Sequence, residues 1–200
     1  MKYLILTALF TITGTLAMSE TTENTHTQTA SFGGGCFWCV EPFFEQLKGV
    51  KSVKSGYQGG SVANPSYKEV TTGKTGHAEV VQVTYDPQVI SYAELLEVFF
   101  QIHDPTTLNR QGADSGTQYR STILYYNDEQ KTQAEAAIEK LNREKVFSRP
   151  VVTKVEPAGE FYVAEGYHQD YFANNPNAPY CRLVIAPKMK KIQLREELLK

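Results

Sequence analysis

The order of strand-like and helix-like segments between Thr29 and Tyr126 restricts the fold more than any other feature. Helices are predicted by apolar residues at helical spacing over 36–47 and 91–103. Strands are predicted over four short segments: 29–34, 50–57, 78–85 and 119–126. The resulting β-α-β-β-α-β order is that of the ferredoxin-like split unit. We therefore expect an α+β protein, a two-layer α/β sandwich with a ferredoxin-like core.

Local signals place the ends of the two helices. Pro42 is tolerated only near a helix start, so the first helix is expected to begin close to Cys36. Gly49 ends it. Ser91 is expected to cap the second helix, with Glu94 completing a capping box.

The remaining chain is predicted as further elements, long loops and a tail. A helix is expected from about Asn127 to Val146, a strand over 150–155 and a helix over 162–173. An irregular C-terminal segment with a basic tail follows Pro176. The loops over 58–76 and 104–116 are long for a compact domain, and such loops are more often functional than idle.

The N-terminal residues resemble an export signal. Lys2 supplies a positive start, residues 3–17 are mainly apolar, and Thr15-Leu16-Ala17 offers small residues for cleavage. The run is shorter than the roughly 20 apolar residues of a membrane span. Residues 1–17 are therefore predicted to be a signal peptide, 18–29 a flexible leader and 30–200 a single domain. A periplasmic or secreted protein without stable membrane association after cleavage is expected.

Composition narrows the function classes. The net charge of −2 and the pI near 6.1 show no excess of basic residues, so nucleic acid is not an expected partner. Three cysteines are an odd number, and an exported protein with a structural framework usually pairs its cysteines. At least one thiol should therefore be free or reactive.

Cys36 is the principal candidate nucleophile. It lies between Gly33-Gly34-Gly35 and the expected helix start, where free N–H groups favour a thiolate. The glycines leave space for another molecule to approach. The alternative is a small buried core cysteine.

The other two cysteines leave alternatives open. Cys39 forms a Cys-x-x-Cys pair with Cys36, which suggests thioredoxin-type chemistry, although Cys39 could merely pack one helical turn away. A late, mobile Cys181 could form a disulfide with a sulfenic acid at Cys36, or could be a free surface thiol. His77, His103 and His168 have no close ligand partners, so a metal site is not expected.

Beyond these residues, several segments together resemble one family. Gly35-Cys36-Phe37-Trp38 is similar to the signature of the A-type peptide methionine sulfoxide reductases, and the likeness extends over about residues 30–187. The further matching segments, in the order of that family, are Gly56-Tyr57-Gln58-Gly59-Gly60, Asn64-Pro65-Ser66-Tyr67, Thr75-Gly76-His77-Ala78-Glu79-Val80, His103-Asp104-Pro105-Thr106, Asn109-Arg110-Gln111-Gly112-Ala113-Asp114, Gln118-Tyr119-Arg120-Ser121 and Tyr167-His168-Gln169-Asp170-Tyr171.

The resemblance implies a role for each matching side chain. Cys36 would attack the sulfoxide sulfur of methionine-S-sulfoxide, free or in peptides. Phe37 and Trp38 would form an apolar wall for the S-methyl group. Tyr67, Tyr119 and Glu79 would point at the sulfoxide oxygen. Asp114 would help to shape the site, and Tyr171 would close it. Glu79 would have to be a neutral acid, so its pKa must be raised by an apolar site.

The resemblance also implies a recycling route. Cys36 would become a sulfenic acid and then a Cys36–Cys181 disulfide, reduced by thioredoxin or another dithiol, with no resident cofactor. Cys39 is a departure, because not every member has it, and many members carry two C-terminal cysteines where this chain has one. A disulfide within one helical turn would be strained unless that turn opens. A monomeric enzyme of protein repair after oxidative damage is expected.

Two other functions remain as alternatives. A thiol–disulfide oxidoreductase using Cys36 and Cys39 would lose activity in Cys39→Ser, whereas a sulfoxide reductase assayed with a small dithiol would not. A non-catalytic module for oxidised or Met-rich peptides would bind without turnover.

Overall fold

The computed structural model describes residues 26–200, so the predicted signal peptide and most of the predicted leader lie outside the described residues. Its strands are β1 (Gln28–Gly34), β2 (Val50–Gln58), β3 (Ala78–Tyr85), β4 (Arg110–Gln111), β5 (Asp114–Ser115), β6 (Ser121–Tyr125), β7 (Lys154–Pro157) and β8 (Tyr162–Val163). Its α-helices are α1 (Glu41–Glu45), α2 (Tyr67–Val70), α3 (Tyr92–Gln101), α4 (Asp128–Arg143), α5 (Tyr171–Asn174) and α6 (Ala186–Lys191). Shorter helical turns are η1 (Phe37–Cys39), η2 (Thr117–Tyr119), η3 (Gly166–His168), η4 (Cys181–Ile185) and η5 (Glu196–Leu198).

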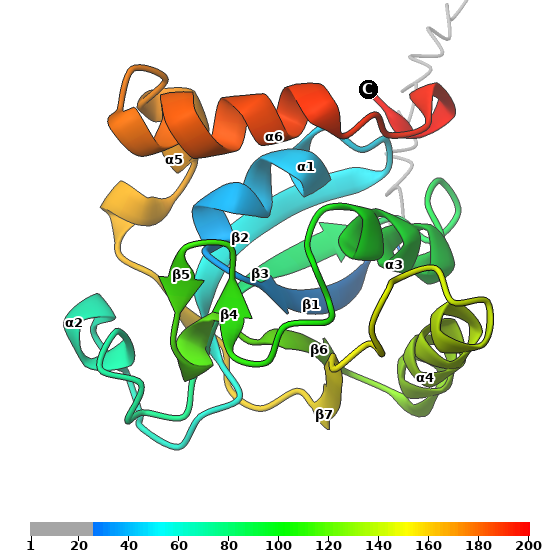
Figure 1. Ribbon diagram of the computed structural model, residues 1–200, viewed down its shortest axis with the longest axis horizontal. Helices are drawn as coiled ribbons and strands as arrows, with labels where there is room; N and C mark the ends of the chain where they lie inside the picture. The colour runs from blue at the N-terminus through cyan, green and yellow to red at the C-terminus, as the bar shows by residue number, and fades with distance from the viewer. Residues whose placement is uncertain (1–25) are drawn as a thin grey trace, which may run out of the picture.

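The architecture is a mixed α/β fold built on one mixed sheet (Figure 1). The six-stranded sheet has the order β7-β6-β1-β3-β2-β8, and its β6–β7 pair is parallel. The pairs β1–β3, β1–β6 and β2–β3 are antiparallel. The strand predicted over 29–34 is confirmed as β1, which begins one residue earlier, so residues 28 and 29 belong to the sheet and not to the predicted leader.

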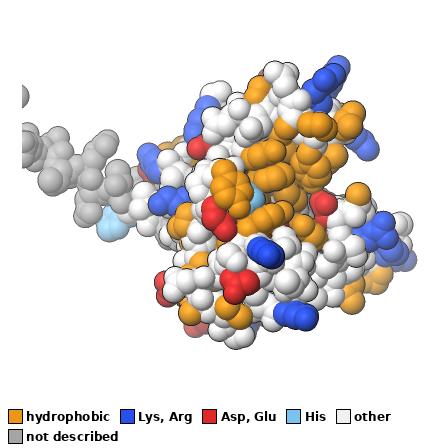
Figure 2. Space-filling model, turned by 90° about the vertical axis from the view of Figure 1, so that its left-hand side faces the viewer, with side chains coloured by type: hydrophobic (Ala, Val, Ile, Leu, Met, Phe, Trp, Pro, Cys, Tyr) orange, Lys and Arg blue, Asp and Glu red, His pale blue; other side chains and the backbone are white. Residues whose placement is uncertain are grey.

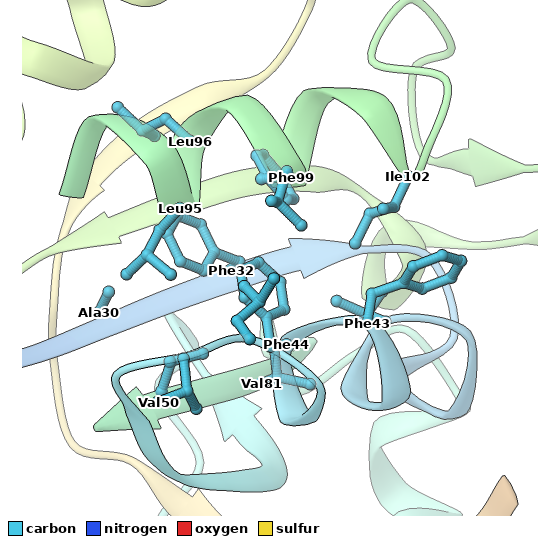
Figure 3. Close-up of a cluster of buried hydrophobic side chains, with 14 of the residues drawn as sticks. Ala30, Phe32, Phe43, Phe44, Val50, Val81, Leu95, Leu96, Phe99 and Ile102 are labelled. Carbon is cyan, nitrogen blue, oxygen red and sulfur yellow. The ribbon is translucent and has the colours of Figure 1, made fainter. Parts of the chain in front are cut away.

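The hydrophobic core lies between the sheet and the helices α1 and α3 (Figure 3). Phe32 of β1 stacks on Phe44 of α1 and Phe99 of α3, with ring centroids 5.1 Å apart in both pairs. All three side chains are fully buried. Because each buried phenylalanine contributes about 1.5–3 kcal/mol, this aromatic stack anchors both helices to the central strand.

The second predicted helix starts as expected. The Ser91 side chain accepts a hydrogen bond from the Glu94 N–H at 3.2 Å, and Glu94 accepts one from the Ser91 N–H at 2.8 Å. This reciprocal pair is the predicted capping box.

The first predicted helix is wrong in its extent. Pro42 occupies the first turn of α1, because a residue without an N–H is tolerated there, and α1 therefore starts at Glu41. The preceding residues form the separate 3₁₀ turn η1. Cys36 itself has extended backbone, with φ −60° and ψ 127°.

The predicted long loops contain regular structure. Ser66 caps the short helix α2 through a capping box with Glu69, and β4 pairs with β5 as a hairpin. Tyr119 lies in η2 rather than in a strand, which begins at Ser121. The helix α4 ends at Arg143, before the predicted end near Val146. The strand predicted over 150–155 corresponds to β7, which begins four residues later than predicted.

The prediction for the C-terminal part was also wrong. The helix predicted over 162–173 is divided into β8, η3 and α5, and the left-handed Asp170 (φ 51°) redirects the chain between η3 and α5. The segment predicted to be irregular is helical over η4 and α6, where Cys181 and Ile185 of η4 are buried. Within residues 26–200, no helix is long and apolar enough to span a membrane.

Candidate active site

The loop after β1 presents Cys36. Gly35 has φ +95°, a conformation that L side chains rarely adopt, and a Cβ there would lie 2.6 Å from Gln111 Cγ. A Cβ on Gly34 would lie 3.1 Å from both Phe99 and His103. The glycine run is therefore needed for the close packing that positions Cys36.

Glu79 lies beside Cys36 as a buried acid. It belongs to β3 and is 1% exposed. The Phe37 N–H donates to Glu79 Oε2 at 3.2 Å, while Oε1 has no hydrogen-bond partner among the described residues. Burial raises the pKa of Glu79 to about 8, although hydrogen bonds from Phe37 and Cys36 lower it. Glu79 is therefore protonated at neutral pH, as its predicted role requires.

The expected thiolate at Cys36 is not supported. Burial raises the pKa of Cys36 well above its usual value, and the neighbouring Glu79 and Cys39 raise it further. The hydrogen bond from the Trp38 N–H lowers it. Because η1 has only three residues, it offers few aligned peptide dipoles to oppose the loss of hydration. Cys36 is a thiol in the free protein.

Two tyrosines complete the polar side of the site. Tyr67 begins α2, and Tyr119 ends η2. Burial, followed by the charge of Glu79, raises the pKa of Tyr67 to about 12 and also raises the pKa of Tyr119. Cys36 contributes to both shifts, so both phenols lie near the thiol and remain hydrogen-bond donors.

An aromatic wall forms the apolar side. Phe37 is 1% exposed, whereas Trp38 is partly exposed and stacks on Tyr171 with centroids 3.6 Å apart and planes 7° apart. Figure 2 shows hydrophobic side chains gathered on the face where α5, β5 and α2 lie in Figure 1. Tyr167 on η3 adds an exposed aromatic ring, at 62%.

His168 and Glu165 are site residues that the sequence did not assign. The His168 ring lies 4.4 Å from Tyr67, 5.1 Å from Phe37 and 5.4 Å from Trp38, centroid to centroid. Glu165 accepts hydrogen bonds from the Tyr67 N–H at 2.8 Å and the Tyr57 hydroxyl at 2.7 Å. The segment Tyr167-His168-Gln169 was recognised, but its contact with Tyr67 depends on chain folding and has no local signal.

A cavity of about 240 Å³ opens beside the thiol. Tyr180 crosses it, donating a hydrogen bond to Asp114 Oδ2 at 2.9 Å, with its hydroxyl 3.3 Å from Cys39 Sγ. Asp114 therefore lines the cavity and holds Tyr180 in place. The residues lining the cavity are Cys36, Cys39, Gln111, Gly112, Ala113, Asp114, Tyr180, Val184 and Lys188.

Comparisons with known proteins agree with this geometry. The family model described as peptide methionine sulfoxide reductase matches residues 28–198. The chain belongs to this family. The peptide methionine sulfoxide reductase of Sulfolobus acidocaldarius is 58% identical to this chain, over 82% of this chain and 92% of the relative. That of Deinococcus radiodurans is 57% identical, over 82% of this chain and 80% of the relative.

A solved structure of Mxr1 from Saccharomyces cerevisiae, in reduced form, is also similar. It is 34% identical with a TM-score of 0.73, over 87% of this chain and 95% of that chain. Mxr1 has also been solved in complex with Trx2.

The three cysteines of this methionine sulfoxide reductase family member are free thiols. Cys181 is not a surface thiol, because its side chain is fully buried and packs with Cys39 and Ile185. Burial raises the pKa of both Cys39 and Cys181. The structure thus separates Cys181 from the cavity that Cys36 and Cys39 share.

The histidines in this reductase have structural surroundings. His103 hydrogen-bonds to the Phe99 carbonyl and Ser121 Oγ at 2.7 Å each, and burial lowers its pKa to about 4. His77 contacts the Val62 carbonyl at 2.8 Å. Within residues 26–200, no group of three or more His, Cys, Asp or Glu side chains is placed to hold a metal ion.

Proposed function

We propose that the protein reduces methionine-S-sulfoxide, free or in proteins, to methionine, and so repairs proteins after oxidative damage. The observation that carries this proposal is the placement of the Cys36 thiol against the protonated Glu79 at an aromatic wall. A sulfoxide needs both a sulfur nucleophile and a proton for its departing oxygen. Membership of the reductase family supports the same reaction.

The two sides of the site fit the two sides of the substrate. Phe37 and Trp38 offer apolar surface for the S-methyl group, and Tyr171 extends this surface by stacking on Trp38. The sulfoxide oxygen lies toward Glu79, Tyr67 and Tyr119, which can donate hydrogen bonds as charge develops. Only one epimer of a chiral sulfoxide can place its methyl group and its oxygen on these two sides at once, which supports selection of a single epimer.

The first step transfers one oxygen atom. Cys36 sulfur attacks the sulfoxide sulfur while Glu79 gives its proton to the oxygen, and the thiol proton replaces the one that Glu79 loses. The attack forms a bond between the Cys36 sulfur and the substrate sulfur. The protonated oxygen then passes as hydroxide to the Cys36 sulfur while the substrate's sulfur–oxygen bond and the new sulfur–sulfur bond break, which releases methionine and leaves Cys36 as a sulfenic acid. The methionine sulfur is reduced by two electrons, and the Cys36 sulfur is oxidised by two.

Recycling then uses a second cysteine of the chain. A disulfide that includes Cys181 is reduced by thioredoxin or another dithiol, so no resident cofactor is needed. The complex of Mxr1 with Trx2 and the 34% identity to Mxr1 support a thioredoxin-like partner. This scheme is favoured over a plain Cys-x-x-Cys oxidoreductase, because that reaction has no use for Glu79 or the two tyrosines.

Three further expectations belong to the proposal. Residues 1–17 support export to the periplasm or secretion by a cleaved signal peptide. The protein acts as a monomer. The strand order β6-β1-β3-β2 with antiparallel pairing, together with α1 and α3 on one core, supports a ferredoxin-like unit.

A paired assay tests the proposed reaction. The purified protein is given the S and R epimers of a methionine sulfoxide derivative separately, with dithiothreitol. Consumption of the S epimer, and its loss in Cys36→Ser, are the expected results. Reduction of neither epimer, or of the R epimer alone, contradicts the proposal, and reduction of insulin disulfides instead would favour the oxidoreductase.

A further inference from the structure

We infer that Cys39 is the thiol that first resolves the Cys36 sulfenic acid, and that the Lys188 ammonium group positions and activates Cys39 for this step. The inference rests on the proposed function, because the sulfenic acid forms only if Cys36 reduces a sulfoxide. It replaces the expected direct Cys36–Cys181 bond with an intermediate Cys36–Cys39 disulfide.

The turn between the two cysteines permits this bond. The Cys39 N–H donates to the Cys36 carbonyl at 2.9 Å, so residues 36–39 form one tight turn. The Cα atoms at the ends of such a turn lie within about 7 Å, close to the range that disulfides span. Cys36 has extended backbone at the start of η1, so it lies outside the regular helix that the sequence predicted.

The cavity favours Cys39 over Cys181 as the first partner. Cys36 and Cys39 line the same cavity, beside Asp114, Tyr180 and Lys188. Cys181 is fully buried and packs against Cys39. A direct bond from Cys36 to Cys181 would require Cys181 to leave this buried cluster, whereas Cys39 already lies between them.

Lys188 is held beside Cys39 by two contacts. Its Nζ donates to the Cys39 carbonyl at 2.9 Å and lies 5.3 Å from the centroid of the Phe43 ring. Both contacts come from a partly buried side chain on α6, the helix that follows the Cys181 turn. A cation fixed at this place favours the thiolate of Cys39, which is the form that attacks.

The surrounding electrostatics agree with this placement. Burial is the main effect on the Cys39 pKa and raises it, but Lys188 is the largest opposing influence and lowers it. Conversely, burial lowers the pKa of Lys188, while Cys39 and Cys36 raise it. The cysteine and the lysine therefore stabilise each other's charged forms.

Tyr180 links Cys39 to Asp114. Its hydroxyl donates to Asp114 Oδ2 at 2.9 Å, so the Cys39 thiol can donate to the Tyr180 oxygen, which lies 3.3 Å from Sγ. This chain of hydrogen bonds orients Sγ within the cavity. It also gives the thiol proton a path to groups near the departing oxygen.

The reaction balances without an additional reagent. The Cys39 sulfur attacks the Cys36 sulfur, the sulfur–sulfur bond forms, and the bond from Cys36 sulfur to oxygen breaks. The oxygen leaves as water with its own proton and the proton of the Cys39 thiol. Cys39 is oxidised as the sulfenic sulfur is reduced. Cys181 can then attack Cys39 sulfur, giving a Cys39–Cys181 disulfide and returning the proton and the thiol to Cys36.

Trapping of the first disulfide tests the order of the cysteines. The full chain and its Cys181→Ser and Cys39→Ser variants are mixed with methionine-S-sulfoxide without reductant, quenched in acid, alkylated and mapped by mass spectrometry. We expect a Cys36–Cys39 disulfide in Cys181→Ser, and a Cys36 sulfenic acid that dimedone captures in Cys39→Ser. A Cys36–Cys181 disulfide that forms in Cys39→Ser as fast as any disulfide forms in the unaltered chain would overturn the inference.

Lys188 is tested by the rate and pH profile of the same step. Removal of its charge in Lys188→Met should raise the Cys39 pKa, and each unit of increase lowers the thiolate fraction about tenfold. Disulfide formation should slow relative to methionine formation, its pH profile should move to higher pH, and Lys188→Arg should restore both. The exposed Lys190→Met on the same helix is the matched control.

The outcomes separate this inference from the function on which it rests. If the unaltered chain forms no methionine, the proposed function itself fails. If methionine forms normally but Lys188→Met leaves the pH profile of disulfide formation in place, the role of Lys188 is wrong. A slower step with an unshifted profile would indicate only a structural role, and would also contradict the inference.

Discussion

The main-chain N–H of Phe37 donates to Glu79 Oε2 at 3.2 Å, so the residue that follows the nucleophile directly orients the acid. This contact joins η1, which carries the aromatic wall, to β3 of the central sheet. Because Glu79 is buried and its second oxygen is unpartnered among residues 26–200, that oxygen is available to a substrate.

Replacement of Glu79 by glutamine should remove most of the reductase activity. Glutamine keeps the shape and can still accept from the Phe37 N–H, but it cannot supply a proton to the sulfoxide oxygen. The kcat for methionine-S-sulfoxide should fall by about 10²–10⁴-fold, the usual contribution of general acid catalysis. The exposed Glu135→Gln on α4 is the control, and comparable activity in both variants would contradict the role.

The pH dependence of the first step follows from the same carboxyl group. Its pKa of about 8 keeps Glu79 protonated below that pH and ionised above it. The rate of methionine formation in a single turnover should therefore decline as the pH rises through about 8. A rate that instead keeps rising with thiolate formation would show that Cys36 ionisation controls the step.

Because of Glu79, the stability of the fold should also decrease as the pH rises. The folded pKa of about 8 exceeds the ordinary value of 4.5, so unfolding releases a proton between these two pH values. The free energy of unfolding should therefore receive a contribution from Glu79 that decreases as the pH rises through this window. Urea denaturation across that range should show a weaker decrease in Glu79→Gln than in the unaltered chain.

The two tyrosine hydroxyls should contribute separately to transition-state stabilisation. Tyr67→Phe and Tyr119→Phe each remove one donor directed at the sulfoxide oxygen and preserve the ring. Loss of one such donor typically costs about 2.7–4 kcal/mol, or roughly 10²–10³-fold in kcat. Tyr125→Phe, on β6 away from these donors, is the control. Steady-state kinetics with an unchanged kcat in Tyr67→Phe and Tyr119→Phe would be incompatible with these roles.

The aromatic stack of the core should dominate the stability of the domain. Phe44→Ala removes a fully buried ring stacked on Phe32 and should lower the free energy of unfolding by about 3–5 kcal/mol. Leu183→Ala, at a side chain that is 76% exposed, should change it by less than about 0.5 kcal/mol. Denaturant titration compares the two variants, and equal destabilisation would argue against the assigned core.

The central strands and α3 were predictable because their signals are local. The alternation of Val81, Val83 and Tyr85 defines β3, and the Ser91–Glu94 pair defines the start of α3. Residues with a recognisable sequence context, such as Cys36 and Glu79, were also assigned before their contacts were known. The neutral state of Glu79 was expected from its role, whereas the thiol state of Cys36 was not, because the hydration of Cys36 depends on burial by distant segments.

The remaining features depend on contacts between segments far apart in the sequence. The Cys181 segment was predicted to be irregular, but it forms η4, where Cys181 and Ile185 are buried in one cluster with Cys39. Lys188 is one of several basic residues near the C-terminus, and its sequence position gives no indication of its contact with the Cys39 carbonyl. His168 likewise acquires its position only when η3 packs against Tyr67.

The central claim is that the Cys36 thiol takes the oxygen of an S sulfoxide. The most direct measurement is a single turnover without reductant, in which methionine and the oxidation state of Cys36 are quantified together after rapid quenching. Methionine should form from the S epimer in proportion to enzyme, matched by oxidation of Cys36, and none should form in Cys36→Ser. Methionine formation by Cys36→Ser, or equal turnover of the R epimer, would contradict the claim.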